Sequence, residues 1–354
     1  MASRRNRLKL KPLREQVMVI TGATSGIGLS TARAAAKRGA SLIIAARNEG
    51  ALKSVCEELA SKGAKAAYVV ADVGREADVR AIAQGAVDRF GGFDTWVNDA
   101  GVTIFGALAS TPIEDQRRLF DTNYWGVVYG SLVAAEHLRA RPGGGAIINL
   151  GSALSDFAFP WQGAYAASKH GVKAFTAALR MELMREHAPI SVTLIKPATT
   201  DTPYIDHTKN LTEGGIKSPP PVYATPLVAE AILYAAEHRV RELTIGGIGP
   251  AIAFLTALAP SIAEPVLAIV APILQRGSAA PALKADSLHQ PGQDLRERTY
   301  HKGVRRQSLY TAAQMRPQAT LALGLLTGLA AGAALFTGRR FARKSGPTPD
   351  PAAS

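Results

Sequence analysis

The 354-residue sequence predicts an α/β fold, in which a doubly wound parallel sheet of about seven strands has helices on both faces. Short apolar runs alternate along the chain with longer helical segments, and these runs are nearly continuous in Val, Ile, Leu and Ala, as strands buried on both faces must be. A glycine-rich turn also separates the first strand from the first helix. We expect strands at residues 17–20, 41–46, 66–70, 94–97, 146–150, 191–195 and 243–245, and long helices at 112–139 and 164–186.

The glycine-rich turn is Thr21-Gly-Ala-Thr-Ser-Gly-Ile-Gly28, which lies between the first apolar run and an alanine-rich helix at 29–38. A strand, a glycine turn and a helix are the context that a dinucleotide pyrophosphate needs, because glycine lets the backbone approach phosphate and the helix N-terminus offers free N–H groups. Three residues separate Gly22 from Gly26, so the spacing differs from G-x-G-x-x-G. The alternative is an ordinary tight turn, but its place at the first strand–helix junction favours a Rossmann-like nucleotide site.

A second motif, Tyr165-Ala-Ala-Ser-Lys169, places a phenol and an ammonium one helical turn apart. We expect the cation to lower the phenol pKa from its ordinary value of about 10. Ser152 lies thirteen residues before Tyr165, at the end of an apolar run, where its hydroxyl can bind a reacting oxygen. A tyrosine and a lysine at this spacing are more often a packed ring beside a solvated amine. The motif therefore indicates catalysis only together with other motifs of the same site.

Together these residues resemble the classical short-chain dehydrogenase/reductase family, over most of residues 12–247. The family motif T-G-x-x-x-G-x-G is matched in full by Thr21 to Gly28, and the Asn-Asn-Ala-Gly element reads Asn98-Asp99-Ala100-Gly101. The Pro-Gly element reads Pro197-Ala198. Two departures follow: Asp99 is expected to alter a strand-stabilising hydrogen bond, and Ala198 lacks the backbone freedom of glycine.

The resemblance implies an oxidoreductase that transfers hydride between nicotinamide and a carbonyl or alcohol. Tyr165 would be the general acid/base, and Ser152 would hold and polarise the substrate oxygen. Lys169 would tune Tyr165 and hold the nicotinamide ribose, and Asn123 would support a water relay that returns the proton to Lys169. The alternative is a non-catalytic NADP(H)-binding membrane scaffold or redox sensor, which would not need these four side chains together.

Cofactor choice depends on the end of the second strand, Ala45-Ala46-Arg47-Asn48. An NAD site places an acid there on the ribose hydroxyl, whereas here no acid precedes Glu49 and Arg47 can pair with a 2′-phosphate. We therefore expect NADP(H) rather than NAD(H), the alternative being that Arg47 is only a surface residue. By resemblance the cofactor path comprises Gly22, Thr24, Ser25, Gly26, Ile27, Gly28, Arg47, Asp72, Val73, Asn98, Ala100, Gly101, Tyr165, Lys169, Pro197, Thr200 and Thr202.

The formal net charge of +13 belongs to the ends of the chain. Residues 1–14 carry six Lys or Arg and no acid, residues 296–316 carry six against one acid, and residues 339–354 carry four against one. The core, residues 15–295, is then close to neutral, so we expect no nucleic-acid partner, which would need a basic face. Basic ends suit an anionic lipid surface, although solvated tails have the same composition.

Residues 319–337 are uncharged and rich in Leu, Ala and Gly, long enough as a helix for a bilayer core of about 30 Å. Gly324, Gly328 and Gly332 give a small-residue stripe for helix packing in lipid. We expect a membrane-anchored enzyme with its catalytic domain in the cytoplasm, the alternatives being a soluble cytoplasmic protein or a tail that mediates oligomerisation. The predicted regions are a basic arm (1–11), the catalytic domain (12–249), a helical or linker extension (250–316), the transmembrane anchor (317–338) and a basic, then disordered tail (339–354).

The extension begins with an apolar stretch, residues 251–274, that Pro260, Pro265 and Pro272 interrupt. Because proline breaks helices, we expect two short helices that pack over the active site, with a position on the membrane surface as the alternative. Residues 203–222 are long enough for a mobile lid. The aromatic loop 157–161 and Tyr204 suggest a hydrophobic ketone, aldehyde or alcohol as substrate, the alternative being that these rings serve only structural packing. The histidines lack metal-ligand spacing, so we expect no metal site, and we expect a homo-oligomer.

Overall fold

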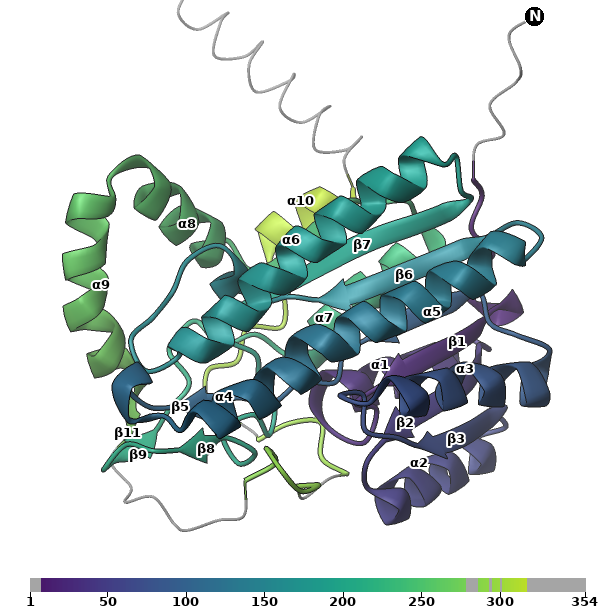
Figure 1. Ribbon diagram of the computed structural model, residues 1–354, viewed down its shortest axis with the longest axis horizontal. Coiled ribbons are helices and arrows are strands. Elements are labelled where there is room, and N and C mark those ends of the chain that lie inside the picture. Colours follow the sequence, from purple (N-terminus) through teal and green to yellow (C-terminus); the bar gives the residue numbers. More distant parts are fainter. Residues whose placement is uncertain (1–7, 278–285, 293–294, 300, 317–354) are drawn as a thin grey trace, which may run out of the picture. The chain divides into compact units, whose positions relative to one another are not determined.

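The computed structural model describes residues 8–277, 286–292, 295–299 and 301–316, and a seven-stranded parallel sheet forms its centre (Figure 1). The strand order is β3-β2-β1-β4-β6-β7-β10, so the chain adds strands on one side of β1 first and then, from β4, on the other side. Doubly wound sheets open a ligand cleft at this switch point between β1 and β4. This confirms the predicted fold class. The strands are β1 (Val17–Thr21), β2 (Ser41–Ala46), β3 (Ala66–Val70), β4 (Thr95–Asn98), β6 (Gly145–Leu150), β7 (Ile190–Pro197) and β10 (Glu242–Ile245).

Helices cover both faces of the sheet. One face carries α1 and α7, which pack against each other, and the other carries α3, α5 and α6 (Figure 1). The predicted strands all form, with ends shifted by at most two residues, because their apolar runs are long enough to be buried on both faces. The helices around the sheet are α1 (Gly26–Lys37), α2 (Glu49–Ser61), α3 (Glu76–Phe90), α4 (Ile113–Phe120), α5 (Gly126–Ala140), α6 (Gly163–Arg185) and α7 (Thr225–Glu237).

The helix predicted over residues 112–139 is interrupted, so that expectation was wrong in detail. A π-helical turn at Asp121–Trp125 separates α4 from α5. Within this turn the buried Asn123 side chain accepts a hydrogen bond from the Val102 N–H at 2.8 Å and donates to the Val102 carbonyl at 2.9 Å. Such turns commonly mark functional sites, and this one ties the helix to the loop after β4.

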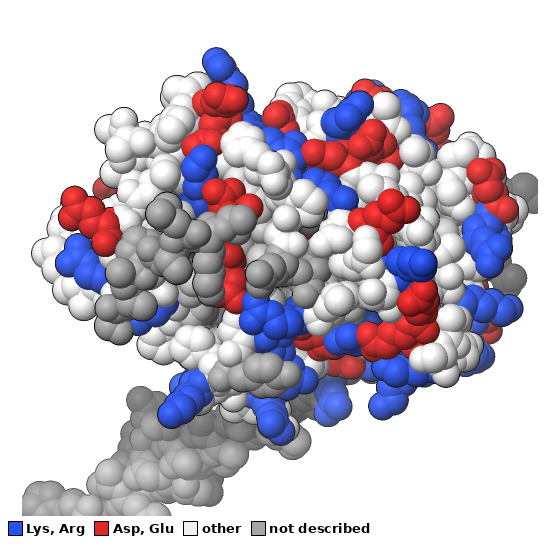
Figure 2. Space-filling view, turned by 90° about the horizontal axis from the view of Figure 1, so that it is seen from below, with Lys and Arg blue, Asp and Glu red and all other residues white. Residues whose placement is uncertain are grey.

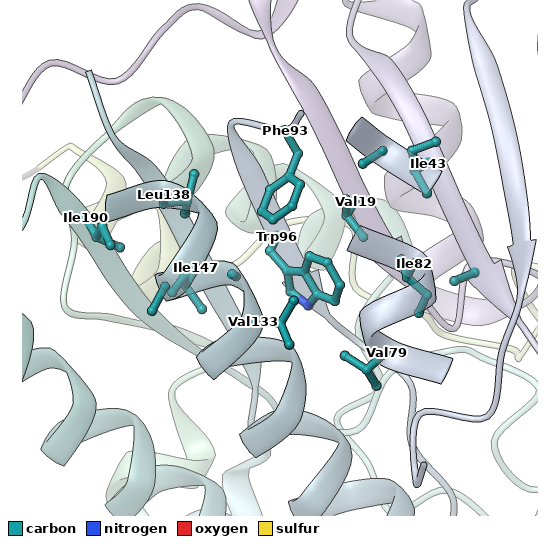
Figure 3. Close-up of a cluster of buried hydrophobic side chains, with 14 of the residues drawn as sticks. Val19, Ile43, Val79, Ile82, Phe93, Trp96, Val133, Leu138, Ile147 and Ile190 are labelled. Atoms are coloured by element: carbon teal, nitrogen blue, oxygen red, sulfur yellow. The ribbon is translucent and has the colours of Figure 1, made fainter. Parts of the chain in front are cut away.

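The core centres on Trp96 of β4, which is fully buried between the sheet and the helices α3 and α5 (Figure 3). Phe93 lies with its ring centroid 5.3 Å from that of Trp96. Beside this cluster, the Asn98 side chain accepts from the Trp96 indole N–H at 2.7 Å and donates to Asn149 of β6 at 2.8 Å. These bonds join neighbouring strands through a buried polar network that also includes Ser131.

Beyond the sheet, α8 (Ile248–Leu258) and α9 (Pro260–Gln275) form a helical hairpin, as predicted. Pro260 opens α9, where its missing N–H costs nothing, whereas Pro265 and Pro272 lie inside the helix. The strand that follows α9 pairs with the loop after β7, which fastens the hairpin to that loop. The remaining elements are β5 (Ile104–Phe105), β8 (Lys209–Asn210), β9 (Gly215–Ile216), β11 (Arg276–Gly277), α10 (Leu309–Met315) and 3₁₀ turns at Leu13–Glu15, Leu108–Ser110 and Ala153–Ser155.

The predicted membrane anchor at 317–338, the tail at 339–354 and residues 1–7 of the basic arm lie outside the described residues. Within the described part of the chain, every helix is too short or too polar to span a bilayer. On the face seen in Figure 2, Lys and Arg are interspersed with Asp and Glu over much of the visible surface. The described residues likewise hold no cluster of His, Cys, Asp and Glu suited to a metal ion.

The network around Asn98 gives a test of the fold. Replacing Asn98 by Ala leaves the buried Trp96 N–H without its acceptor, so we expect the free energy of unfolding to fall by about 1–3 kcal/mol. Urea denaturation would measure this, with Gln84→Ala on the exposed side of α3 as the control. Equal stability of the two variants would contradict the assignment.

Candidate active site

One cavity of about 560 Å³ lies at the carboxyl ends of the central strands, where the strand order reverses. Most of the residues predicted from the sequence line it together, although they come from seven separate segments. Gly28, Asn98 and Asn123 do not line it. The predicted residues that do are Gly22, Thr24, Ser25, Gly26, Ile27, Arg47, Asp72, Val73, Ala100, Gly101, Ser152, Tyr165, Lys169, Pro197, Thr200 and Thr202.

The glycine turn forms the floor of one end of the cavity. Gly22 has a φ of +70° and lies so close to Ala100 that a Cβ would be 2.8 Å from the Ala100 Cα. A Cβ on Gly28 would be 2.3 Å from the Gly22 carbonyl oxygen. No side chain fits at either position. Gly26 and Ile27 at the start of α1 line the cavity, and the Gly26 N–H donates to the Arg296 carbonyl at 2.9 Å. A helix N-terminus beside a cavity suits a phosphate group.

The other end of the cavity holds the predicted catalytic residues. Ser152 follows β6, and its hydroxyl is hydrogen-bonded to that of Tyr165 on α6. Lys169, one turn further along α6, donates to the Leu150 carbonyl at 2.8 Å, and its Nζ lies 5.7 Å from the centroid of the Tyr165 ring. The three side chains therefore meet as the sequence predicted.

The predicted direction of the Tyr165 pKa is wrong for this structure. Burial raises the pKa of Tyr165 to about 12, because the cavity wall excludes the water that would stabilise a phenolate. The Ser152 hydrogen bond opposes this shift without overcoming it. Burial also lowers the pKa of Lys169 to about 8. The motif predicts that Tyr165 and Lys169 are close. Only the fold shows that desolvation raises the pKa of Tyr165 by more than the Lys169 ammonium lowers it.

Asn123 is held away from the cavity by its two bonds to Val102, and it also donates to Ser168 at 3.2 Å. Ser168 lies on α6 beside Lys169, so Asn123 joins the π-helical turn to the catalytic helix. It thereby positions the loop after β4 against α6. Its part in a proton relay stays a prediction.

Tyr204 is a member of the site that the sequence placed only near the cavity entrance. Its hydroxyl is hydrogen-bonded to that of Tyr165, donates to Thr103 at 2.7 Å and accepts from Gln162 at 3.1 Å. Gln162 in turn accepts from Gln275 of α9 at 2.9 Å. These polar groups connect the catalytic tyrosine to the hairpin. No sequence motif could reveal the link, since Gln162 and Gln275 are 113 residues apart.

Asp99 has a different role from the one predicted. The hydrogen bond between strands belongs to Asn98, whereas the Asp99 carboxylate accepts from the Gly28 N–H at the start of α1. Burial raises the pKa of Asp99 to about 7, and the opposing attraction of Lys169 does not cancel this. Asp99 therefore places a titratable carboxyl group between the glycine turn and Lys169.

Arg47 also differs from expectation. Its guanidinium donates to the carbonyls of Ser287, Leu288 and Gln290, in a segment of the extension that lies against the cavity. The sequence gave no sign of this contact, because residues 286–292 contain no recognisable motif and lie about 240 positions away.

The wall opposite the glycine turn is apolar. Phe157 and Phe159 reach the cavity from the loop before α6, and Ile252 of α8 packs beside them. Leu267, Val270 and Leu274 of α9 line the cavity further along. The predicted covering of the site by two short helices is therefore confirmed. The chamber combines a polar catalytic corner with apolar walls.

Comparison with known proteins agrees with this geometry. The family model described as short chain dehydrogenase matches residues 16–212. This match covers more than half of the chain. The chain belongs to the short-chain dehydrogenase/reductase family.

Similar proteins cover between 65% and 93% of the chain. The uncharacterized oxidoreductase YxnA of Bacillus subtilis is 44% identical over 336 residues, which cover 93% of each protein. A short-chain dehydrogenase/reductase from Burkholderia phymatum in complex with NAD has a TM-score of 0.63 at 26% identity, covering 77% of this chain and 99% of that one. An alcohol dehydrogenase from Thermococcus sibiricus complexed with 5-hydroxy-NADP has a TM-score of 0.57 at 25% identity, covering 65% and 95%.

This short-chain dehydrogenase/reductase is thus an oxidoreductase of the family, with the nicotinamide cofactor that the family uses. The solved structures contain NAD in one case and an NADP derivative in the other. The residues of the cavity fit a dinucleotide, since the glycine turn and the start of α1 line it and Gly22 has no space for a side chain.

Asp99 gives a pH-dependent prediction. Its folded pKa of about 7 exceeds the ordinary 3.8, so the folded state binds this proton more tightly, and the resulting stability is lost as pH rises from about 4 to 7. Asp99→Asn should therefore gain stability over wild type that is about 1–3 kcal/mol larger at pH 7.5 than at pH 5. Differential scanning calorimetry at both pH values would measure this, with the exposed Asp88→Asn as control. An equal gain at both pH values would count against the buried carboxyl.

Proposed function

We propose that the protein is an NADP(H)-dependent reductase of a hydrophobic carbonyl compound. The observation that carries this proposal is the meeting of Ser152, Tyr165 and Lys169 at one end of a cavity whose other end is a phosphate-binding glycine turn. When bound, the dinucleotide supplies hydride to the carbonyl carbon. The protein supplies the proton and the position of the oxygen.

Proton donation suits Tyr165 as it stands. With a pKa of about 12 the phenol is protonated at neutral pH, so it can give its proton to an oxygen that gains negative charge. Ser152 lies within hydrogen-bonding distance of the same hydroxyl and would hold that oxygen. The reverse reaction would start from the phenolate, which burial disfavours at neutral pH.

The preference for NADP(H) is supported by the end of β2. Positions 45–48 offer no carboxylate for a ribose hydroxyl, and Arg47 brings a cation to the cavity. The substrate class is supported by the apolar walls from the aromatic loop and from α8 and α9, which would exclude water from the reacting carbonyl.

The mechanism is tested by Tyr165→Phe in a panel of carbonyl compounds with NADPH and with NADH. We expect wild type to prefer NADPH. The variant should lose at least about 10²-fold in kcat, because the proton donor is gone, while its Kd for NADPH stays within about threefold. Tyr129→Phe on α5, remote from the cavity, is the matched control. Turnover by Tyr165→Phe near that of wild type would exclude this mechanism.

We further propose that the enzyme works at the cytoplasmic surface of a membrane and takes its substrate from lipid. The outer side of the hairpin supports this, since Phe254, Leu258, Ile262 and Ile269 are each at least 66% exposed. Glu264 is the hairpin's single charged residue. Lys217 and Arg276 are exposed beside the end of α9. They bring positive charge next to the apolar surface of the hairpin, as in helices that lie in anionic bilayers.

Contact between the hairpin and a membrane can be measured with a dye attached at a single position of the full chain. A solvatochromic dye attached to Ile262→Cys, in a Cys56→Ser background, should shift to the blue on vesicles that contain phosphatidylglycerol. The same dye on Val87→Cys of α3, which is also exposed, should not shift. The comparison distinguishes docking of the hairpin from anchoring elsewhere. Equal spectra at the two positions would refute docking of the hairpin.

A further inference from the structure

Residues 286–292 of the extension, here called the strap, run along the cavity beside the ends of β2 and β3. Ser287, Pro291 and Gly292 line the same cavity as Arg47 and Asp72. In doubly wound folds the acid or arginine after β2 meets the adenosine ribose of a dinucleotide. The strap therefore forms a wall of the adenosine end of the site.

The strap is fastened by its Leu288 side chain, which is fully buried among Val102, Ile104 and Leu119. This apolar contact joins it to the loop after β4 and to α4. Burial of this apolar side chain favours the docked conformation of the strap. Leu288 thus holds the residues on either side of it at the cavity.

Hydrogen bonds from two arginines hold the backbone of the strap in place. Arg47 donates to the carbonyls of Ser287, Leu288 and Gln290, and Arg118 donates to the Leu288 carbonyl at 3.1 Å. Arg118 also pairs with Asp72 at 2.6 Å, so the end of β3 is tied to the same point.

The flanks of the strap are held as well. The imidazole of His289 lies 2.8 Å from the carboxylate of Asp115 on α4, and the Ser287 N–H donates to the His207 carbonyl at 3.0 Å. The backbone of the strap is therefore fixed at successive residues.

Within this fixed segment the Ser287 hydroxyl lacks a partner among the described residues. The residue is only 7% exposed, and its Oγ is buried and makes no hydrogen bond. Native proteins rarely leave a buried hydroxyl unpaired, because the lost hydration is not replaced. Ser287 lines the cavity with its other atoms, and a rotation about χ1 would turn the shielded hydroxyl toward a ligand oxygen there.

We propose that the strap belongs to the nucleotide site and that the Ser287 hydroxyl binds an oxygen of the adenosine half of the dinucleotide. The proposal rests on the proposed function in that the ligand is NADP(H) or NAD(H). The oxygen belongs either to a 2′-phosphate or to a group shared by both nucleotides, and both can hydrogen-bond to a serine hydroxyl. Leu288 is then a positioning residue that keeps Ser287 in place.

The first test is the Kd of the full chain for NADPH and NADH, measured by isothermal titration calorimetry. Ser287→Ala should weaken NADPH binding about tenfold, and Ser54→Ala on the exposed side of α2 should not change it. A loss confined to NADPH identifies the 2′-phosphate as the partner, and an equal loss for NADH identifies a shared oxygen. Thermal melting verifies that both variants are folded.

Unchanged Kd values for Ser287→Ala, with a wild type that binds NADPH, would overturn the role of Ser287 and leave the proposed function standing. A wild type that binds neither nucleotide would overturn the proposed function itself. The two failures are therefore distinct.

The second test addresses the fastening of the strap. Leu288→Ala should raise the rate of NADPH dissociation several-fold in stopped-flow fluorescence, because Ser287 is no longer held at the cavity. Bound NADPH should also slow proteolytic cleavage within residues 286–292 of wild type. A dissociation rate equal to that of wild type, or cleavage that NADPH does not slow, would overturn the role of the strap.

Discussion

The close approach of the first strand–helix turn to the end of β4 is the constraint on which the site depends. Gly22 touches the backbone of Ala100, and Gly28 sits against the Gly22 carbonyl, with no space for a Cβ at either position. This contact places the start of α1 at the point where the strand order reverses. The phosphate end of the cavity, the loop after β4 and, through Asn123, the catalytic helix are all positioned relative to it.

Desolvation sets the chemistry of the cavity. Burial in the wall of the cavity raises the pKa of Tyr165 and lowers that of Lys169. Asp99, an acid where the family has asparagine, adds a third group whose pKa burial shifts, in this case upward. A protonated phenol is favoured in such surroundings. The site is therefore suited to donating a proton to a carbonyl oxygen at neutral pH.

The extension after β10 contributes to both ends of the cavity. The hairpin of α8 and α9 supplies apolar walls near the catalytic residues and reaches Tyr204 through Gln275 and Gln162. The strap lies at the ends of β2 and β3, where Leu288 and the contacts with Arg47 hold it against the cavity. A residue that favours NADP(H) in the sequence is thus also an anchor for a remote segment. The extension after β10 therefore lines the cavity both beside the catalytic residues and beside the ends of β2 and β3.

The sequence by itself determined the parallel sheet, the order of its strands and helices and the three side chains, Ser152, Tyr165 and Lys169, that meet at one end of the cavity. These depend on patterns within a few residues, such as the buried runs of β1 and β7 and the one-turn spacing of Tyr165 and Lys169. The tertiary structure alone decided the pKa of Tyr165, the partners of Asn98 and Asp99, and the position of Ser287. Burial and contacts between residues far apart in the chain control these properties, and local sequence carries no record of either.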